Sequence, residues 1–121
     1  MKHCLVVDDS AVIRKVARRI LESMDFLIAE AQDGREAIEC CNALMPDAIL
    51  LDWNMPQMDG YEFLKALRVM PEGKRPKVLF CTTENDLAAI ARAMHAGADD
   101  YMMKPFDRQI LLTKFQQIGV A

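Results

Sequence analysis

The sequence lacks any apolar run near the roughly 20 residues that a membrane-spanning helix needs. Its start, MKHCLVVDDS, reaches two acids before a signal-like apolar stretch can develop. The formal net charge is only -3, so the chain carries no broad positive field for nucleic acid or an anionic membrane. From these absences we expect a cytoplasmic chain that is neither transmembrane nor secreted and that has no nucleic-acid or membrane partners.

The four cysteines form no CxxC pair, and neither histidine stands at zinc-site spacing from them. We expect buried free thiols at Cys4, Cys40, Cys41 and Cys81. The sequence also contains no internal repeat, no low-complexity tract and no linker. With 121 residues, of which 52% are hydrophobic, one domain can bury a core without disulfides. We therefore expect a single, monomeric domain over residues 1–121.

Strand-like apolar segments alternate with helical periodicity along the whole chain. The strand-like segments are 4–7, 26–31, 47–52, 77–81 and 100–103. The helical patterns occupy 13–24, 34–45, 61–70, 86–97 and 107–119. The third strand-like segment, DAILLD, is continuously apolar, as in a strand that is covered on both faces. Five such alternations predict an α/β fold, a doubly wound parallel sheet with helices on both faces.

The helical patterns also predict which side chains face the sheet. In the first helix the apolar stripe comprises Ile13, Val16, Ala17, Ile20, Leu21 and Met24, with Arg14, Lys15, Arg18 and Arg19 facing outward. The stripes of the second, fourth and fifth helices comprise Ala37, Ile38, Cys41 and Leu44, then Leu87, Ile90, Ala91 and Met94, then Leu111, Phe115 and Ile118. Gly97 suits a helix C-cap.

Polar residues gather where the strands end. These are Asp8 and Asp9, Asp52, Thr82 and Thr83, and Lys104. The carboxyl ends of parallel strands meet at one edge of a sheet, where α/β proteins bind ligands. Each residue alone could be a helix cap, a turn former or a solvated side chain. Their shared position at one edge favours a functional site.

Three carboxylates within about 4 to 6 Å of one another repel by roughly 4 kcal/mol per close pair at an effective dielectric near 20. A hard cation relieves this repulsion, and Mg²⁺ prefers oxygen ligands while keeping several waters. With the metal in place, a carboxylate can attack phosphorus and form an aspartyl phosphate. In this interpretation Asp52 is the phosphoacceptor, Lys104 pairs with the phosphoryl group and Thr82 donates a hydrogen bond to it.

The motifs VVDDS, LLDWNMPQMDG, CTTEND and YMMKPF place Asp8, Asp52, Thr82 and Lys104 at intervals of 44, 30 and 22 residues. In this order and spacing the chain resembles, over essentially its whole length, the receiver domains of bacterial two-component response regulators. The resemblance implies five strands in the order 2-1-3-4-5, flanked by five helices. It also implies a Mg²⁺ site formed by Asp8, Asp9, Asp52 and the main-chain carbonyl of Asn54.

The resemblance further implies phosphorylation of Asp52 by a histidine kinase or a histidine phosphotransfer protein. Thr82 and Tyr101 would form the switch pair, and the Lys104–Pro105 peptide would be cis. Asn54 and Glu84 would tune the loss of the phosphoryl group. The surface formed by helix 4, strand 5 and helix 5 would then bind a downstream protein. The domain would be a signalling phosphoacceptor that catalyses its own phosphotransfer and dephosphorylation, and not an enzyme acting on other substrates.

Within this family the motifs are similar to those of the stand-alone chemotaxis regulators, although Thr83 replaces a commoner small residue. A fragment of a larger regulator, a phosphorelay shuttle and a phosphate sink remain alternatives. The RKVARR stretch in the first helix could dock an acidic phosphodonor or could simply face water.

Three rival functions fit the sequence less well. A haloacid-dehalogenase-type phosphatase would need an acid at position 54, where the chain has Asn54. A flavodoxin-type carrier would not place DDS beside an anionic phosphate. A phosphorylation-independent scaffold would have lost the acids, which this chain keeps.

Overall fold

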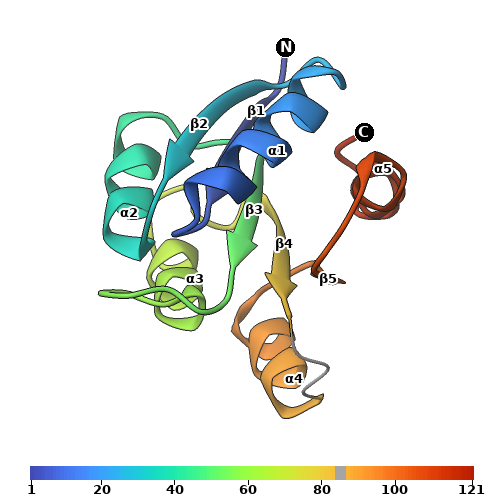
Figure 1. Cartoon of the computed structure of the whole chain (residues 1–121). Helices are drawn as coiled ribbons and strands as arrows, with labels where there is room; N and C mark the ends of the chain where they lie inside the picture. The colour runs from blue at the N-terminus through green and yellow to red at the C-terminus, as the bar shows by residue number, and fades with distance from the viewer. Residues whose placement is uncertain (84–86) are drawn as a thin grey trace.

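The computed structural model describes residues 1–83 and 87–121 (Figure 1). Its elements are β1 (His3–Val7), α1 (Ala11–Glu22), β2 (Leu27–Ala31), α2 (Gly34–Ala43), β3 (Ala48–Asp52), α3 (Gly60–Arg68), β4 (Lys77–Thr82), α4 (Leu87–Ala96), β5 (Asp100–Met103) and α5 (Arg108–Gln117). Each lies within two residues of the bounds that the hydrophobic periodicity predicts.

The five strands form one parallel sheet in the order β2-β1-β3-β4-β5, which confirms the expected topology. β3 lies in the middle and is buried along its whole length, as its continuous apolar run predicts. The register aligns Val7 with Leu51 and Asp52 with Cys81. The carboxyl ends of β1, β3 and β4 therefore lie side by side.

The two faces of the sheet carry separate hydrophobic cores because alternate strand residues point to opposite faces. Leu5 and Val7 of β1 belong to the core shared with α2, α3 and α4. Cys4 and Val6 belong to the core shared with α1 and α5. In Figure 1 the helices flank the sheet on both sides accordingly. This double coverage confirms the doubly wound architecture.

Short polar side chains cap the helices that follow the strands. The N-caps of α1, α2, α3 and α5 are Ser10, Asp33, Asp59 and Asp107. Each side chain accepts a hydrogen bond from a main-chain N–H group of the first turn, an interaction that contributes about 1 kcal/mol. These caps fix where the helices begin and keep the β1–α1 connection short.

The predicted inward faces were wrong at several positions. Arg14 and Arg18 are partly buried against β2, while Val16 is exposed. In α4 the buried residue is Ala93, and the partly buried Ile90 and Ala96 pack against the same core, because this helix meets the core through a narrow contact. The rest of its expected stripe, Leu87, Ala91 and Met94, is exposed. Leu44 is also exposed, because α2 ends before it.

The predicted states of the remaining helical and cysteine residues agree with the structure in most cases. Leu111 and Phe115 are buried, and Gly97 follows α4 with a positive φ of 116°. All four cysteines are free, and burial raises the pKa of Cys4 to about 12. Cys40 is the exception to full burial. Within residues 1–83 and 87–121, no helix has the length and apolarity that a bilayer crossing requires.

Candidate functional site

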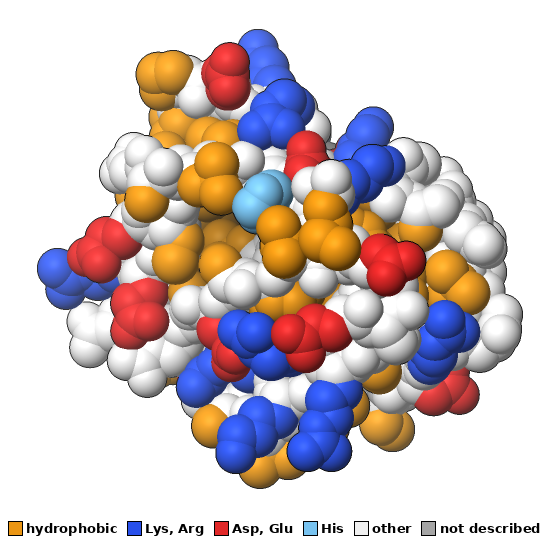
Figure 2. Space-filling view, turned by 90° about the horizontal axis from the view of Figure 1, so that it is seen from above, with side chains coloured by type: hydrophobic (Ala, Val, Ile, Leu, Met, Phe, Trp, Pro, Cys, Tyr) orange, Lys and Arg blue, Asp and Glu red, His pale blue; other side chains and the backbone are white. Residues whose placement is uncertain are grey.

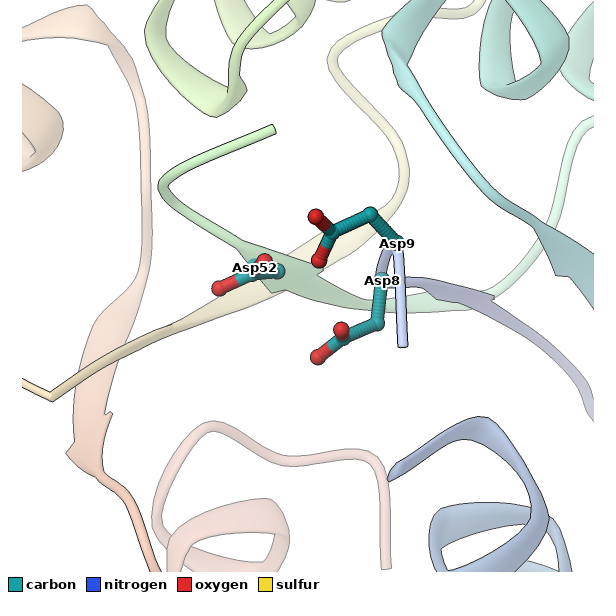
Figure 3. Close-up of side chains that lie close together, drawn as sticks. All are labelled: Asp8, Asp9 and Asp52. Atoms are coloured by element: carbon teal, nitrogen blue, oxygen red, sulfur yellow. The ribbon is translucent and has the colours of Figure 1, made fainter. Parts of the chain in front are cut away.

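Three acids meet at the carboxyl edge of the sheet. Asp8 and Asp9 follow β1, and Asp52 is the last residue of the neighbouring β3. One carboxylate oxygen from each residue lies within 4.8 Å of those of the other two, and Figure 3 shows the three side chains reaching into the same space. Asp8 and Asp52 are only 3% and 7% exposed, whereas Asp9 is exposed. The sequence therefore located this cluster correctly.

Lys104 brings the only positive charge that the structure describes in direct contact with Asp52. Its Nζ donates to Asp8 Oδ2 at 2.7 Å and to Asp52 Oδ1 at 3.0 Å. The lysine follows β5, where its main-chain N–H donates to the carbonyl of Thr82 at 2.8 Å, and the Lys104–Pro105 peptide is cis. One ammonium thus contacts two of the three clustered carboxylates.

This imbalance appears in the titration of the site. Burial raises the pKa of Asp52; the hydrogen bond from Lys104 opposes this rise, and the charge of Asp8 adds to it. For Lys104, burial acts to lower the pKa, but the hydrogen bonds to Asp8 and Asp52 outweigh it, and the pKa is raised. Lys104 therefore stays protonated, and the ionised site retains an excess of negative charge.

The donor set fits Mg²⁺. Around an octahedral ion with bonds of about 2.1 Å, adjacent oxygens are about 3 Å apart and opposite ones about 4.2 Å. One carboxylate oxygen from each of Asp8, Asp9 and Asp52 lies within 4.8 Å of the other two, near the upper end of that range. All three donors are carboxylate oxygens, which suit Mg²⁺ better than zinc or copper.

The loop after β3 is fixed close to Asp52. The N–H of Trp53 donates to the carbonyl of Cys81 at 3.1 Å, and the N–H of Gly60 donates to the carbonyl of Trp53 at 3.1 Å. A Cβ at Gly60 would lie 2.7 Å from the carbonyl oxygen of Asp52, so this position requires glycine. Asn54 lies exposed in the same loop.

The two residues expected to form a switch lie on neighbouring strands. Thr82 ends β4 and is 4% exposed, next to Cys81, which pairs with Asp52. Tyr101 lies in β5 opposite Phe80, with ring centroids 6.0 Å apart. Tyr101 is therefore set back from the strand ends that carry the acids. The expected residue Glu84 lies outside the described residues.

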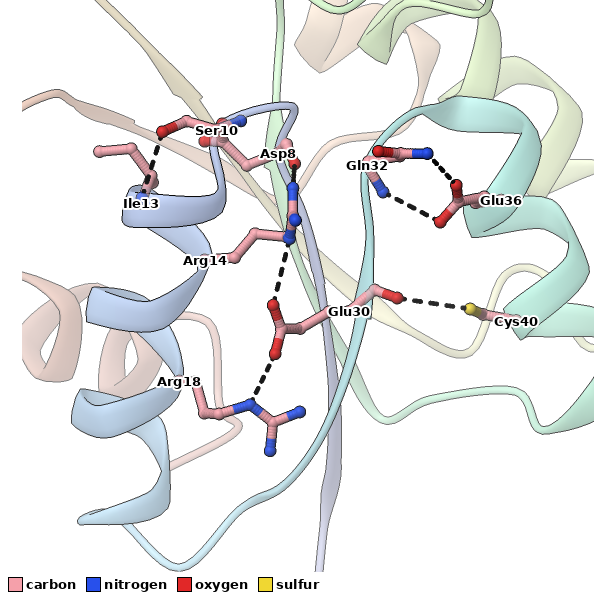
Figure 4. A network of polar contacts seen from close by, with 9 residues as sticks. All are labelled: Asp8, Ser10, Ile13, Arg14, Arg18, Glu30, Gln32, Glu36 and Cys40. Carbon is pink, nitrogen blue, oxygen red and sulfur yellow. Dashed lines mark hydrogen bonds and ion pairs between the residues drawn. The ribbon is translucent and has the colours of Figure 1, made fainter.

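Sequence reasoning missed one contact at the site. Arg14 of α1 donates from Nη1 to the main-chain carbonyl of Asp8 at 2.6 Å. Its Nε donates to Glu30 on β2 at 3.1 Å (Figure 4). The available signal was an Arg14–Arg18 pair one turn apart on a helix, with one acid in the following strand, but such a pair is also typical of a solvated face.

A hollow at the opposite edge of the sheet offers different chemistry. It has a volume of about 500 Å³, and its lining includes His3, Phe26, Leu27 and Leu44. Figure 2 shows this face, where hydrophobic side chains gather around a histidine. Among the described lining residues there is a single acid, Glu22. The carboxyl edge is therefore the better candidate for metal and phosphoryl chemistry.

Comparison with known proteins agrees with this geometry. Residues 4–116 match the family described as the response regulator receiver domain. The chain is 36% identical over 115 residues to a chemotaxis protein CheY from Pseudomonas aeruginosa, covering 94% of this chain and 93% of that protein. It is 37% identical over 114 residues to the response regulator MprA from Mycolicibacterium vanbaalenii, covering 94% of this chain but only 48% of MprA. The chain thus spans about half the length of that relative.

Solved structures show the same likeness. The chemotaxis response regulator CheY4 of Vibrio cholerae superposes with a TM-score of 0.92 at 35% identity, over 98% of each chain. The receiver domain of a sensor histidine kinase from Pseudomonas aeruginosa superposes with a TM-score of 0.88 at 29% identity, over 98% of each chain. That receiver structure has a magnesium ion coordinated in its active site cleft.

Proposed function

This chain belongs to the response regulator receiver domains, and on that premise we propose that it accepts a phosphoryl group on Asp52 in a Mg²⁺-dependent reaction. The donor would be a phosphohistidine of a histidine kinase or a phosphotransfer protein. The observation that carries the proposal is the buried Asp52 carboxylate, which lies beside two further acids and 3.0 Å from the ammonium of Lys104.

In the proposed transfer, an oxygen of Asp52 attacks phosphorus and the phosphorus–nitrogen bond to histidine breaks. The electron pair stays on the imidazole, which then takes a proton from solvent. Lys104, which contacts Asp52 at 3.0 Å, would exchange this contact for one with a phosphoryl oxygen. Thr82 is buried at the neighbouring strand end, and its hydroxyl would donate a hydrogen bond to a phosphoryl oxygen.

Asp8, Asp9 and Asp52, with the carbonyl of Asn54, would hold Mg²⁺. The ion would supply the positive charge that lets a carboxylate approach an anionic phosphoryl group. The protein's contribution is to bring the acids together at the ends of adjacent strands. Asn54 and Glu84 remain the residues predicted to tune loss of the phosphoryl group.

The surface of α4, β5 and α5 is the proposed site for a downstream protein. It carries exposed apolar side chains at Leu87 (76%), Met94 (40%) and Ile110 (42%). Tyr101, which contacts Phe80 in the core and Lys114 on α5, would link the phosphorylation site to this surface. Such a link shifts partner binding by about 1 to 3 kcal/mol in ordinary allosteric couplings.

Chemotaxis-like signalling is the pathway that we propose, because the similarity to chemotaxis proteins extends over nearly the full length of both chains. Participation as the receiver of a larger regulator is the second candidate, supported by the match to about half of MprA. A monomeric state, a single-domain organisation and a cytoplasmic location remain predictions.

The test uses Trp53, the single tryptophan of the chain, which directly follows Asp52. We expect Mg²⁺, and then acetyl phosphate or beryllofluoride, to change its fluorescence. Intact-mass measurement after acetyl phosphate should detect one labile phosphoryl adduct. Asp52→Asn should remove the adduct and the second fluorescence change; a variant that still forms the adduct would disprove the assignment of Asp52.

A further inference from the structure

The main chain of Asp8 is held from two sides. Its N–H donates to the carbonyl of Ala31 on β2 at 3.0 Å, and its carbonyl accepts the 2.6 Å hydrogen bond from Nη1 of Arg14. The Asp8–Asp9 peptide is planar, so fixing its carbonyl oxygen also fixes the direction in which the chain enters Asp9. One arginine therefore constrains where both acids leave the main chain.

Arg14 is itself fixed by Glu30. Its Nε donates to one oxygen of Glu30 at 3.1 Å, while Nε of Arg18 donates to the other at 2.7 Å (Figure 4). The Arg14 side chain is only 17% exposed, although the helical pattern placed it on the outer face. A guanidinium can make the Asp8 and Glu30 contacts together because its donors form a rigid planar fork.

The geometry points to Arg14 as a positioning residue for Mg²⁺ binding, which acts through the main chain of Asp8 and is anchored by Glu30. This inference rests on the proposed function, because it concerns the same metal site. Metal affinity depends on the partners that orient the ligands, and loss of one such partner typically costs about 10- to 100-fold.

The direction in which Mg²⁺ affinity changes on replacing Arg14 distinguishes a positioning role from a purely electrostatic one. Arg14 is a cation close to the acids, so removing its charge should tighten Mg²⁺ binding if electrostatics alone mattered. Removing its hydrogen bond to Asp8 should weaken Mg²⁺ binding if the arginine orients the acids. Arg14→Lys leaves the charge in place, and its single ammonium cannot reproduce both contacts of the fork.

The experiment is a Mg²⁺ titration followed by tryptophan fluorescence, with Arg14→Ala, Arg14→Lys and the control Arg18→Lys. The control replaces another arginine by lysine, one turn further along α1. Arg18 also donates to Glu30, but it does not contact Asp8. We expect the half-saturating Mg²⁺ concentration to rise about tenfold for both Arg14 variants. The fluorescence change at saturation should be preserved, and the control should titrate like the unmodified protein.

Unaltered or tighter Mg²⁺ binding in the Arg14 variants would overturn the inference. An equal loss in Arg18→Lys would also overturn it, because the effect would then come from Glu30 or from general loosening of α1. Thermal unfolding in EDTA verifies that each variant folds, and Arg14→Lys preserves helix propensity should Arg14→Ala be unfolded. Failure of the proposed function looks different: the unmodified protein would bind Mg²⁺ and form no adduct on Asp52.

Discussion

Removing the charge of Asp52 should stabilise the protein in the absence of a divalent cation. The carboxylate is repelled by Asp8, within 4.8 Å, by about 3.5 kcal/mol at an effective dielectric near 20. The exposed Asp9 adds about 1 kcal/mol, because water screens it. Attraction to Lys104 at 3.0 Å returns about 5.5 kcal/mol, so the ionic terms nearly cancel.

The burial cost of the carboxylate is then left almost uncompensated. Desolvation of a buried ion costs several kcal/mol, and the Asp52 side chain is 9% exposed. An asparagine at this position keeps an oxygen that can accept from Lys104 without burying a charge. We therefore expect Asp52→Asn to raise the free energy of unfolding by about 1 to 2 kcal/mol in EDTA, or the melting temperature by about 4 to 8 °C.

The stability difference between Asp52→Asn and the unmodified protein should depend on pH. The pKa of Asp52 is raised by burial and by the neighbouring acids, so the folded state binds its proton more tightly than the unfolded state does. Protonation of Asp52 therefore adds to the free energy of unfolding of the unmodified protein below the ordinary aspartate pKa of about 3.9. This stabilisation is lost as the pH rises through the folded-state pKa of Asp52. The free energy of unfolding of Asp52→Asn should therefore exceed that of the unmodified protein by a growing amount between these two pKa values, and by a constant amount at higher pH.

The assay is thermal unfolding, followed by circular dichroism, in EDTA and in excess MgCl₂. Asp107→Asn is the matched control, because it removes one negative charge at an N-cap, where asparagine caps as well as aspartate. In MgCl₂ the unmodified protein should gain about 2.7 kcal/mol at 100 times its dissociation constant, and Asp52→Asn should gain less. A lower melting temperature for Asp52→Asn in EDTA would refute the reasoning, since Lys104 would then more than compensate for burial.

Three further outcomes can be measured on the same protein. Lys104→Met should tighten Mg²⁺ binding in a fluorescence titration, because no ammonium competes for the carboxylates, and should lower the yield of phosphoryl adduct by intact mass. Gly60→Ala should destabilise the fold by about 1 to 3 kcal/mol in urea unfolding, since the new Cβ would press on the carbonyl of Asp52. The pKa of Glu30 is lowered, chiefly by the hydrogen bond from Arg18, so its contribution is present above about pH 4.3 and is lost in acid. Glu30→Gln should therefore cost about 1 kcal/mol in urea unfolding at pH 7, and this cost should shrink as the pH falls through the lowered folded-state pKa of Glu30.

The sequence was sufficient to predict the sheet and the cluster of acids, because both depend on periodic or positional signals. Continuous apolar runs such as DAILLD identify strands that are buried on both faces, and the topology of parallel sheets then brings Asp8 and Asp52 to one edge. The helix faces were predicted less well. The stripe containing Leu87 and Met94 has the correct spacing for a buried face, yet both side chains are exposed because α4 meets the core through Ala93.

Arg14 shows why part of the site could not be predicted. Periodicity assigns a residue to a side of its helix, but it does not say which groups of a neighbouring strand that side meets. The contact with Asp8 depends on how α1 lies against β2, where Glu30 can bind Arg14 and Arg18 together. An arginine at the border between the buried and exposed faces of a helix can thus act at a strand end.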